Sequence, residues 1–181
     1  LDLGCGSGIL SIAALKLGAS AATAVDIDDK CLDVAYENAA LNGIGRDTYT
    51  VRIGDVLGDE ALRTGLGGGW QMVVANIVAD VIKGLAPLVR PMLAPGGRFL
   101  CSGIIDDRAE EVADCLRANG WELVETRSAE GWSPYLCRGG RGRFRRNNRT
   151  ERRADGAAAL WDARLIFPPR QIPPAFLGHA L

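Results

Sequence analysis

The sequence predicts an α/β domain built on a mostly parallel β-sheet with helices on both faces. Three observations favour this class. Segments with the apolar pattern of strands alternate with segments of helical periodicity at least four times along the chain. A glycine-rich turn joins the first predicted strand to the first predicted helix. The last two predicted strands lack a helix between them, so we expect an antiparallel hairpin at one end of the sheet.

The predicted strands are short and either alternate or run continuously apolar; they lie at residues 1–3, 22–26, 49–53, 71–75, 98–102, 121–126 and 132–137. The predicted helices carry an apolar stripe and end near glycine or asparagine; they lie at residues 9–17, 29–41, 79–92 and 106–119. Pro87 is expected to kink or split the third of these helices. Residues 93–97, Leu-Ala-Pro-Gly-Gly, are expected to form a turn.

The composition excludes several functional classes. With 181 residues, 48% of them hydrophobic, the chain can bury one sizeable core. None of the five cysteines forms a C-x-x-C pair, which argues against a disulfide framework or a zinc site and favours a reducing cytoplasm. The single histidine, His179, stands near the C-terminus, so catalysis by a core histidine is excluded. We expect no transmembrane helix and no signal peptide, because no apolar run is long enough and no basic segment opens the chain.

The charge is divided unevenly along the chain. Residues 1–132 carry 11 Lys and Arg against 19 Asp and Glu, whereas residues 133–181 carry 10 against 3. Eight arginines crowd residues 138–153. We therefore expect a catalytic domain at residues 1–138, whose start is missing, and an Arg-rich, disordered extension at residues 139–181. The arginine run could contact RNA, although a solvated or out-of-frame tail fits it better.

The glycine-rich turn and two carboxylates point to a ligand. In an open α/β sheet, ligands bind at the carboxyl ends of the strands. Gly4 and Gly6 would let the backbone approach the ligand closely. Asp26 ends the second strand, where it could accept both hydroxyls of an adenosine ribose, and Asp55, after the third strand, could reach an adenine edge. The alternatives are a turn without a ligand, a dinucleotide, and S-adenosylmethionine. The last is favoured because the G-x-G-x-x-G pattern of dinucleotide sites is absent and a carboxylate at Asp2 disfavours phosphate.

The sequences of these segments resemble the motifs of class I S-adenosylmethionine-dependent methyltransferases. LDLGCGSG at residues 1–8 looks like their first motif, and VDID at 25–28, GD at 54–55, VVANI at 73–77 and LAPGG at 93–97 follow in the family's order. The finer match, including CSGI at 101–104, resembles the PrmA family of ribosomal protein methyltransferases over residues 1–138. The resemblance implies a Rossmann-like fold and methylation of amino groups on large-subunit ribosomal protein eleven.

The same resemblance implies the site residues. Those that match the family's cofactor site by position are Gly4, Asp26 and Asn76, and those placed there by analogy with the superfamily are Asp2, Cys5, Gly6 and Asp55. Asn76 is the expected catalytic residue, because its side-chain oxygen could hold the acceptor amine toward the methyl group. A helix N-cap is its alternative role. Cys5 is expected to be a small apolar filler rather than a nucleophile.

We therefore expect a cytoplasmic, monomeric protein N-methyltransferase that acts on lysine and α-amino groups of a ribosomal protein. No metal is expected, since a helix N-terminus explains Asp28 and Asp29. The alternatives are a methyltransferase for RNA or a small amine, and an inactive fragment with an RNA-associating arginine tail. No membrane partner is expected, and nucleic acid only through the arginine run at residues 138–153.

Overall fold

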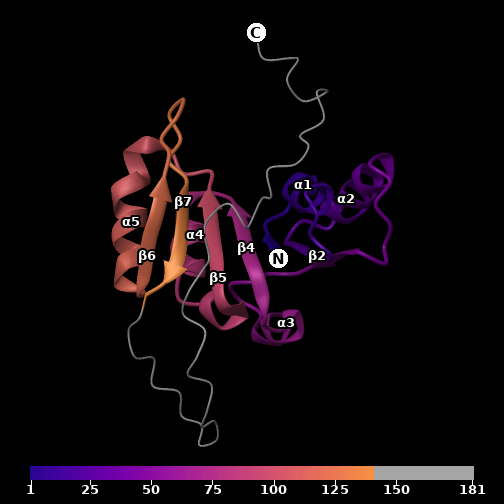
Figure 1. The fold of residues 1–181 in the computed structure, drawn as a ribbon, viewed down its shortest axis with the longest axis horizontal. Helices are drawn as coiled ribbons and strands as arrows, with labels where there is room; N and C mark the ends of the chain where they lie inside the picture. The colour runs from indigo at the N-terminus through magenta and orange to yellow at the C-terminus, as the bar shows by residue number, and fades with distance from the viewer. Residues whose placement is uncertain (141–181) are drawn as a thin grey trace, which may run out of the picture. The chain divides into compact units, whose positions relative to one another are not determined.

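Seven strands form one sheet within residues 1–140, the part of the chain that the structure, a computed structural model, describes (Figure 1). The strand order is β3-β2-β1-β4-β5-β7-β6. The strands are β1 Asp2–Leu3, β2 Ala22–Asp26, β3 Tyr49–Ile53, β4 Trp70–Asn76, β5 Leu93–Ser102, β6 Trp121–Thr126 and β7 Tyr135–Gly139. Strands β1 to β5 pair in parallel, and β7 pairs antiparallel with both β5 and β6. The predicted fold class, including the terminal hairpin, is confirmed.

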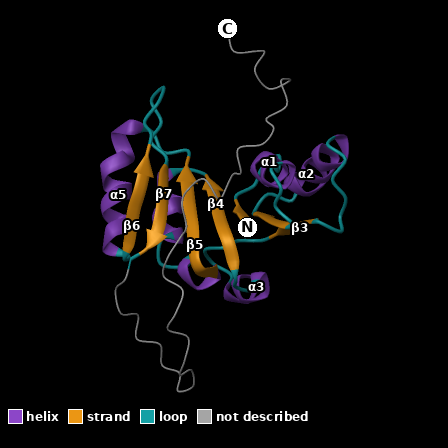
Figure 2. Cartoon of the chain, in the orientation of Figure 1, coloured by secondary structure: helices purple, strands orange, loops and turns teal. Residues whose placement is uncertain are grey.

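In this described part of the chain, five α-helices and two short 3₁₀ helices connect the strands (Figure 2). They are α1 Ile9–Lys16, α2 Lys30–Leu41, α3 Glu60–Leu66, α4 Ala79–Leu85, α5 Ala109–Ala118, and the 3₁₀ helices η1 Arg90–Met92 and η2 Asp106–Arg108. Every parallel connection between neighbouring strands therefore passes through a helix, as parallel pairing requires.

Two hydrophobic cores lie on opposite faces of the sheet. The neighbours Ala24 and Val25 of β2 are both fully buried, but each belongs to a different core, as the alternation of side chains along a strand requires. Helices α1 and α2 pack with Ala24, Tyr49 and Val51 in the smaller core. Helices α4 and α5 cover the larger core around Phe99. Both faces are needed because a parallel sheet is apolar on both sides.

The third predicted helix is split, and the turn expected after it is wrong. Helix α4 ends at Leu85, and η1 starts only at Arg90, so Pro87 interrupts the helix as expected. Residues 93–97, in contrast, belong to β5. Leu93 pairs with Trp70 of β4, and the pairing resumes between Arg98 and Met72 after a shift of register. The turn-forming residues between them are accommodated as an irregularity inside one strand.

Other elements also differ from the expectations. Helix α3 was not expected; Asp59 caps it by accepting a hydrogen bond from the Leu62 N–H at 2.9 Å, but its seven residues are too few to show a helical period. The last strand starts at Tyr135 rather than at residue 132. Trp132, inside the segment predicted as the last strand, is half exposed. The fourth predicted helix begins with the 3₁₀ turn η2.

The extension expected at residues 139–181 lies outside the described residues from position 141 onward. Within residues 1–140, no helix is both long and apolar enough to cross a lipid bilayer. The same described residues contain no group of three or more His, Cys, Asp or Glu side chains arranged to hold a metal ion.

Candidate active site

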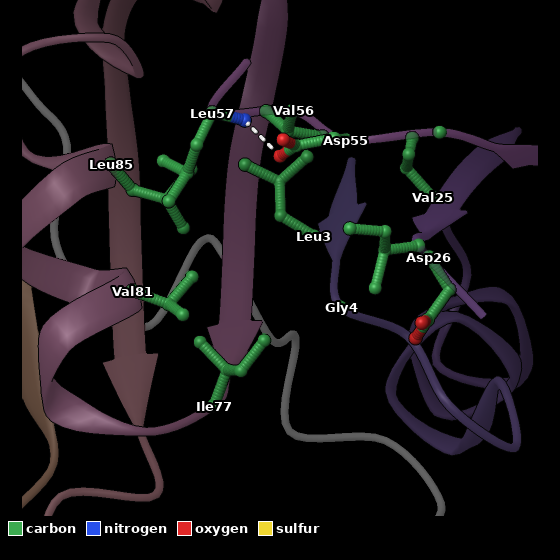
Figure 3. Close-up of a pocket in the computed structure, with 12 residues that line it drawn as sticks. Leu3, Gly4, Val25, Asp26, Asp55, Val56, Leu57, Ile77, Val81 and Leu85 are labelled. Atoms are coloured by element: carbon green, nitrogen blue, oxygen red, sulfur yellow. Dashed lines mark hydrogen bonds between the residues drawn. The ribbon is translucent and has the colours of Figure 1, made fainter. Parts of the chain in front are cut away.

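A pocket of about 300 Å³ opens at the carboxyl ends of the parallel strands (Figure 3). Its walls come from the ends of β1, β2, β3 and β4 and from helix α4. The strand order reverses between β1 and β4, so the pocket lies at the switch point where open α/β sheets bind their ligands. The volume is at the lower end of the range for small-molecule pockets.

Three of the expected site residues line this pocket: Gly4, Asp26 and Asp55. The other four, Asp2, Cys5, Gly6 and Asn76, are not among its lining residues, although each lies within two positions of one that is. Gly4 has a φ of +75°, and a Cβ at its position would stand 2.7 Å from the Cδ1 of Ile77 on the opposite wall. Position 4 therefore requires glycine, both for its backbone conformation and for the width of the pocket.

Four amide groups of the glycine-rich turn are already occupied by the protein itself. The N–H groups of Gly4 and Cys5 both donate to the carbonyl of Val25, at 2.8 and 3.1 Å. The N–H of Gly6 donates to the Asp26 carboxylate at 2.8 Å, and that of Gly8 to the carbonyl of Cys5. A pyrophosphate site would instead present such amides to the ligand. The turn is therefore suited to a ligand without phosphate, which disfavours the dinucleotide alternative.

The two carboxylates of the pocket are held by their neighbours but keep free lone pairs. Oδ2 of Asp26 accepts the Gly6 N–H and Oδ1 accepts the Asp28 N–H at 3.0 Å. Oδ1 of Asp55 accepts the Leu57 N–H at 2.9 Å, the bond drawn in Figure 3. Each carboxylate oxygen can accept a second hydrogen bond. Fixed in this way, Asp26 can bind paired hydroxyl groups and Asp55 can bind an amino group.

An apolar wall, which the sequence did not predict, faces these carboxylates. Its members come from β1, the segment after β3, the end of β4 and helix α4; they are Leu3, Val56, Leu57, Ile77, Val81 and Leu85. In Figure 3 most of them stand together on one side of the pocket, apart from Asp26. A flat aromatic group would be buried by this wall while its polar edge reached a carboxylate. The combination suits a nucleoside.

Asp2 lies beneath the glycine-rich turn, and its side chain is almost fully buried. Its Oδ2 accepts hydrogen bonds from the N–H and the hydroxyl of Ser11, at 3.2 and 2.9 Å. Burial raises the pKa of this carboxyl, while the bonds from Ser11 oppose the rise. In this arrangement Asp2 fastens the start of helix α1 to the first strand.

The side chain of Cys5 belongs to the core between the sheet and helices α1 and α2. Burial raises the pKa of its thiol to about 12, so almost none of it is thiolate near neutral pH. This environment is that of an apolar filler and not of a nucleophile, in agreement with the expectation for Cys5.

Asn76 ends β4 beside the pocket, and its side chain is exposed. The next residue, Ile77, lines the pocket, whereas Asn76 itself is not among its lining residues. Helix α4 begins only at Ala79, with Val78 at the N-cap position and no side-chain cap. The alternative role of Asn76 as a helix N-cap is therefore excluded.

A ring of four charged side chains ties together the segments that flank Asn76. Arg108 of η2 donates two hydrogen bonds to the Asp80 carboxylate of α4, at 2.9 and 2.7 Å. Lys83 pairs with Asp80 and with Glu111, each at 3.1 Å, and Arg108 also pairs with Glu111. The ring joins the chain after β4 to the chain after β5. Hydrogen bonds from Arg108 and then Lys83 hold the pKa of Asp80 well below its usual range.

We expect Asp80→Asn to make the chain less stable at neutral pH, because the lowered pKa means that folding favours the charged carboxylate. That contribution is complete above the ordinary Asp value of 3.8 and is lost as the pH falls through the lowered pKa. Urea unfolding at pH 7 and at pH 3 measures it: the gap between variant and wild type should narrow at the lower pH. Glu37→Gln, at an exposed position on α2, is the control. A gap that widens on acidification would contradict the ring's role.

Comparison with known families agrees with this geometry. The family model described as "Ribosomal protein L11 methyltransferase (PrmA)" matches residues 1–138. A curated protein of that name from Desulfitobacterium hafniense is 45% identical over 131 residues, which is 72% of this chain and 39% of the relative. One from Exiguobacterium is 41% identical over 140 residues, which is 77% of this chain and 43% of the relative. The chain thus spans about two fifths of the length of the curated relatives that it matches.

Solved structures show the same likeness. The crystal structure of a ribosomal protein L11 methylase from Lactobacillus delbrueckii subsp. bulgaricus is 33% identical, with a TM-score of 0.69 over 77% of this chain and 68% of that one. An RNA methyltransferase from Salinibacter ruber, solved with S-adenosyl-L-homocysteine, shares 20% identity at a TM-score of 0.59. At that identity the second structure shows a common fold and no more.

Proposed function

The chain belongs to the ribosomal protein L11 methyltransferase (PrmA) family, and from this premise we propose that it is an S-adenosylmethionine-dependent protein N-methyltransferase. The observation that carries the proposal is the pocket at the β1–β4 switch point, where a carboxylate at each of two strand ends faces an apolar wall. The substrate that we propose is an amino group of ribosomal protein L11, either on a lysine or at the N-terminus.

The pocket residues fit this cofactor. Asp26 can accept the two ribose hydroxyls, and Asp55 can accept the adenine amino group. Ile77, Val81 and Leu85 offer an apolar surface for the adenine ring. The occupied amides of the glycine-rich turn leave no cradle for phosphate, and the cofactor has none. When bound, S-adenosylmethionine would supply a methyl group that its sulfonium already activates.

The task left to the protein is to hold the acceptor amine in line with that methyl group. The amine must be neutral to attack, whereas an exposed lysine has a pKa of about 10.4. Desolvation in the pocket mouth favours the neutral form. The Oδ1 of Asn76 can accept a hydrogen bond from the amine and turn its lone pair toward the methyl group. Positioning of this kind supplies most of the acceleration of a methyl transfer.

The net negative charge of residues 1–132 supports a protein substrate over bare RNA, because a polyanion is repelled by an acidic domain. We also propose that the protein works in the cytoplasm. All five cysteines are free thiols in the structure, which supports a reducing compartment.

Methyl transfer from labelled S-adenosylmethionine tests the proposal. The chain is incubated separately with purified ribosomal protein L11 and with ribosomal RNA, and Asn76→Ala serves as the inactive control. We expect label on amino groups of the protein and none on the RNA. Label on RNA alone would replace the proposed substrate class. Label on neither, from a chain that binds the cofactor, would contradict methyltransferase activity on these substrates.

A further inference from the structure

The side chain of Asn76 lies against the turn that follows β5. Asn76 and Ser102 are paired residues of the parallel strands β4 and β5. One residue further, the Ile77 N–H donates a hydrogen bond to the Ser102 carbonyl at 3.0 Å. The backbone of residues 102–103 is thereby fixed beside the proposed acceptor position.

Gly103, the next residue of this turn, has no room for a side chain. Its φ is +78°, and a Cβ at its position would stand 2.7 Å from the Asn76 Oδ1 and 2.9 Å from both the N and the O of Ile77. Gly43 and Gly96 also have positive φ, at +69° and +80°, yet a Cβ at either would meet no atom within 4 Å. The crowding at Gly103 is therefore a property of its neighbours and not of its backbone conformation.

We propose that Gly103 is a positioning residue for the acceptor amine, because its bare Cα leaves room for the Oδ1 of Asn76 and so sets the orientation of that amide. The proposal rests on the proposed function and deepens it. Gly103 does not touch the amine itself; it acts through Asn76.

The segment that contains Gly103 is held in place on its other side, so a side chain at position 103 would have to displace Asn76 and Ile77. Ile104, the following residue, is fully buried in the larger core. Two residues on, the Asp106 N–H donates to the carbonyl of Gly131 at 3.0 Å, and the Ser133 N–H donates to the carbonyl of Ile104 at 2.9 Å. The hydrogen bonds from Arg108 to Asp80 hold the chain after Gly103 against helix α4. A methyl group at position 103 would therefore press on the Asn76 amide, which is the flexible member of the contact, and also on the backbone of Ile77.

The test compares Gly103→Ala with Gly43→Ala, a matched variant that carries the same backbone strain without the contact. Both should lower the melting temperature. Only Gly103→Ala should lower kcat for methyl transfer to ribosomal protein L11, by about 10- to 100-fold, since misplacement by 1 Å can cost 100-fold. The dissociation constant for S-adenosylmethionine should change much less than kcat, because Ile77 is only one of the residues that line the pocket. Equal kcat for the two variants would overturn the inference.

Asn76→Gln is a second test of the inference. It does not require a glycine variant with a strained backbone to fold. The extra methylene moves the amide away from its place beside Gly103, so kcat should fall as far as in Asn76→Ala. A glutamine variant with kcat within about threefold of wild type would overturn the inference, because it would show that the amide position is not fixed. A wild-type chain that binds the cofactor but methylates no amine would overturn the proposed function instead, and this inference with it.

Discussion

Replacing Asn76 by alanine is expected to lower kcat about 100- to 1000-fold while cofactor affinity changes less than about threefold. The magnitude is that of removing one preorganised polar group at a reacting centre. Cofactor binding should survive because Asn76 does not line the pocket, whereas its neighbour Ile77 does. The loss therefore belongs to the transition state and not to ground-state binding.

Steady-state kinetics at saturating cofactor, together with calorimetric titration of the same samples, separate the two effects. Asn42→Ala is the matched control: Asn42 is an exposed asparagine at the end of α2, whose side chain donates only to the Asn38 carbonyl at 2.8 Å. A comparable loss of kcat and of cofactor affinity in Asn76→Ala would show that Asn76 holds the cofactor and not the amine.

Asp26→Ala should weaken binding of S-adenosylmethionine by at least about 100-fold. Two hydrogen bonds from ligand hydroxyls to a carboxylate contribute about 1.5–3 kcal/mol each, and 1.36 kcal/mol corresponds to a factor of ten. The substitution also frees the N–H groups of Gly6 and Asp28, which Asp26 holds at 2.8 and 3.0 Å. Loss of ligand contacts and loosening of the turn act in the same direction.

Asp28→Ala is the control for this variant. Asp28 stands two residues along the same strand end, carries the same charge and bonds the Lys30 N–H at 3.0 Å, but it does not line the pocket. We expect its affinity for the cofactor to remain within about threefold of wild type. Equal losses in the two variants would mean that the overall negative charge, and not hydroxyl recognition by Asp26, governs binding.

The sheet could be predicted from the sequence because each strand carries its own signal. The strands Ala22–Asp26 and Tyr49–Ile53 have the predicted limits; the first ends in a carboxylate and the second is followed by glycine. Local signals failed where they were brief or contradictory. Helix α3 has only two turns, and Pro95 with its glycines imitates a turn although pairing with β4 continues around them.

The sequence could predict only those residues of the candidate site that lie at the carboxyl end of a single strand. Gly4, Asp26 and Asp55 each follow directly from their place after a strand, and the structure brings all three into one pocket. The apolar wall brings together residues from distant parts of the chain, so it cannot be predicted from any single segment. The contact between Gly103 and Asn76 depends on the register of β4 against β5. No local pattern in the sequence reveals that register.

The measurement that tests the central claim most directly is calorimetric titration of S-adenosylmethionine into the wild-type chain, with the helical and strand content of the same sample checked by circular dichroism. We predict saturable binding of one cofactor per chain, displaced competitively by S-adenosylhomocysteine. Binding displaced instead by a nicotinamide dinucleotide, or no binding by a chain that is folded, would contradict the assignment of the pocket at the β1–β4 switch point as a methyl-donor site.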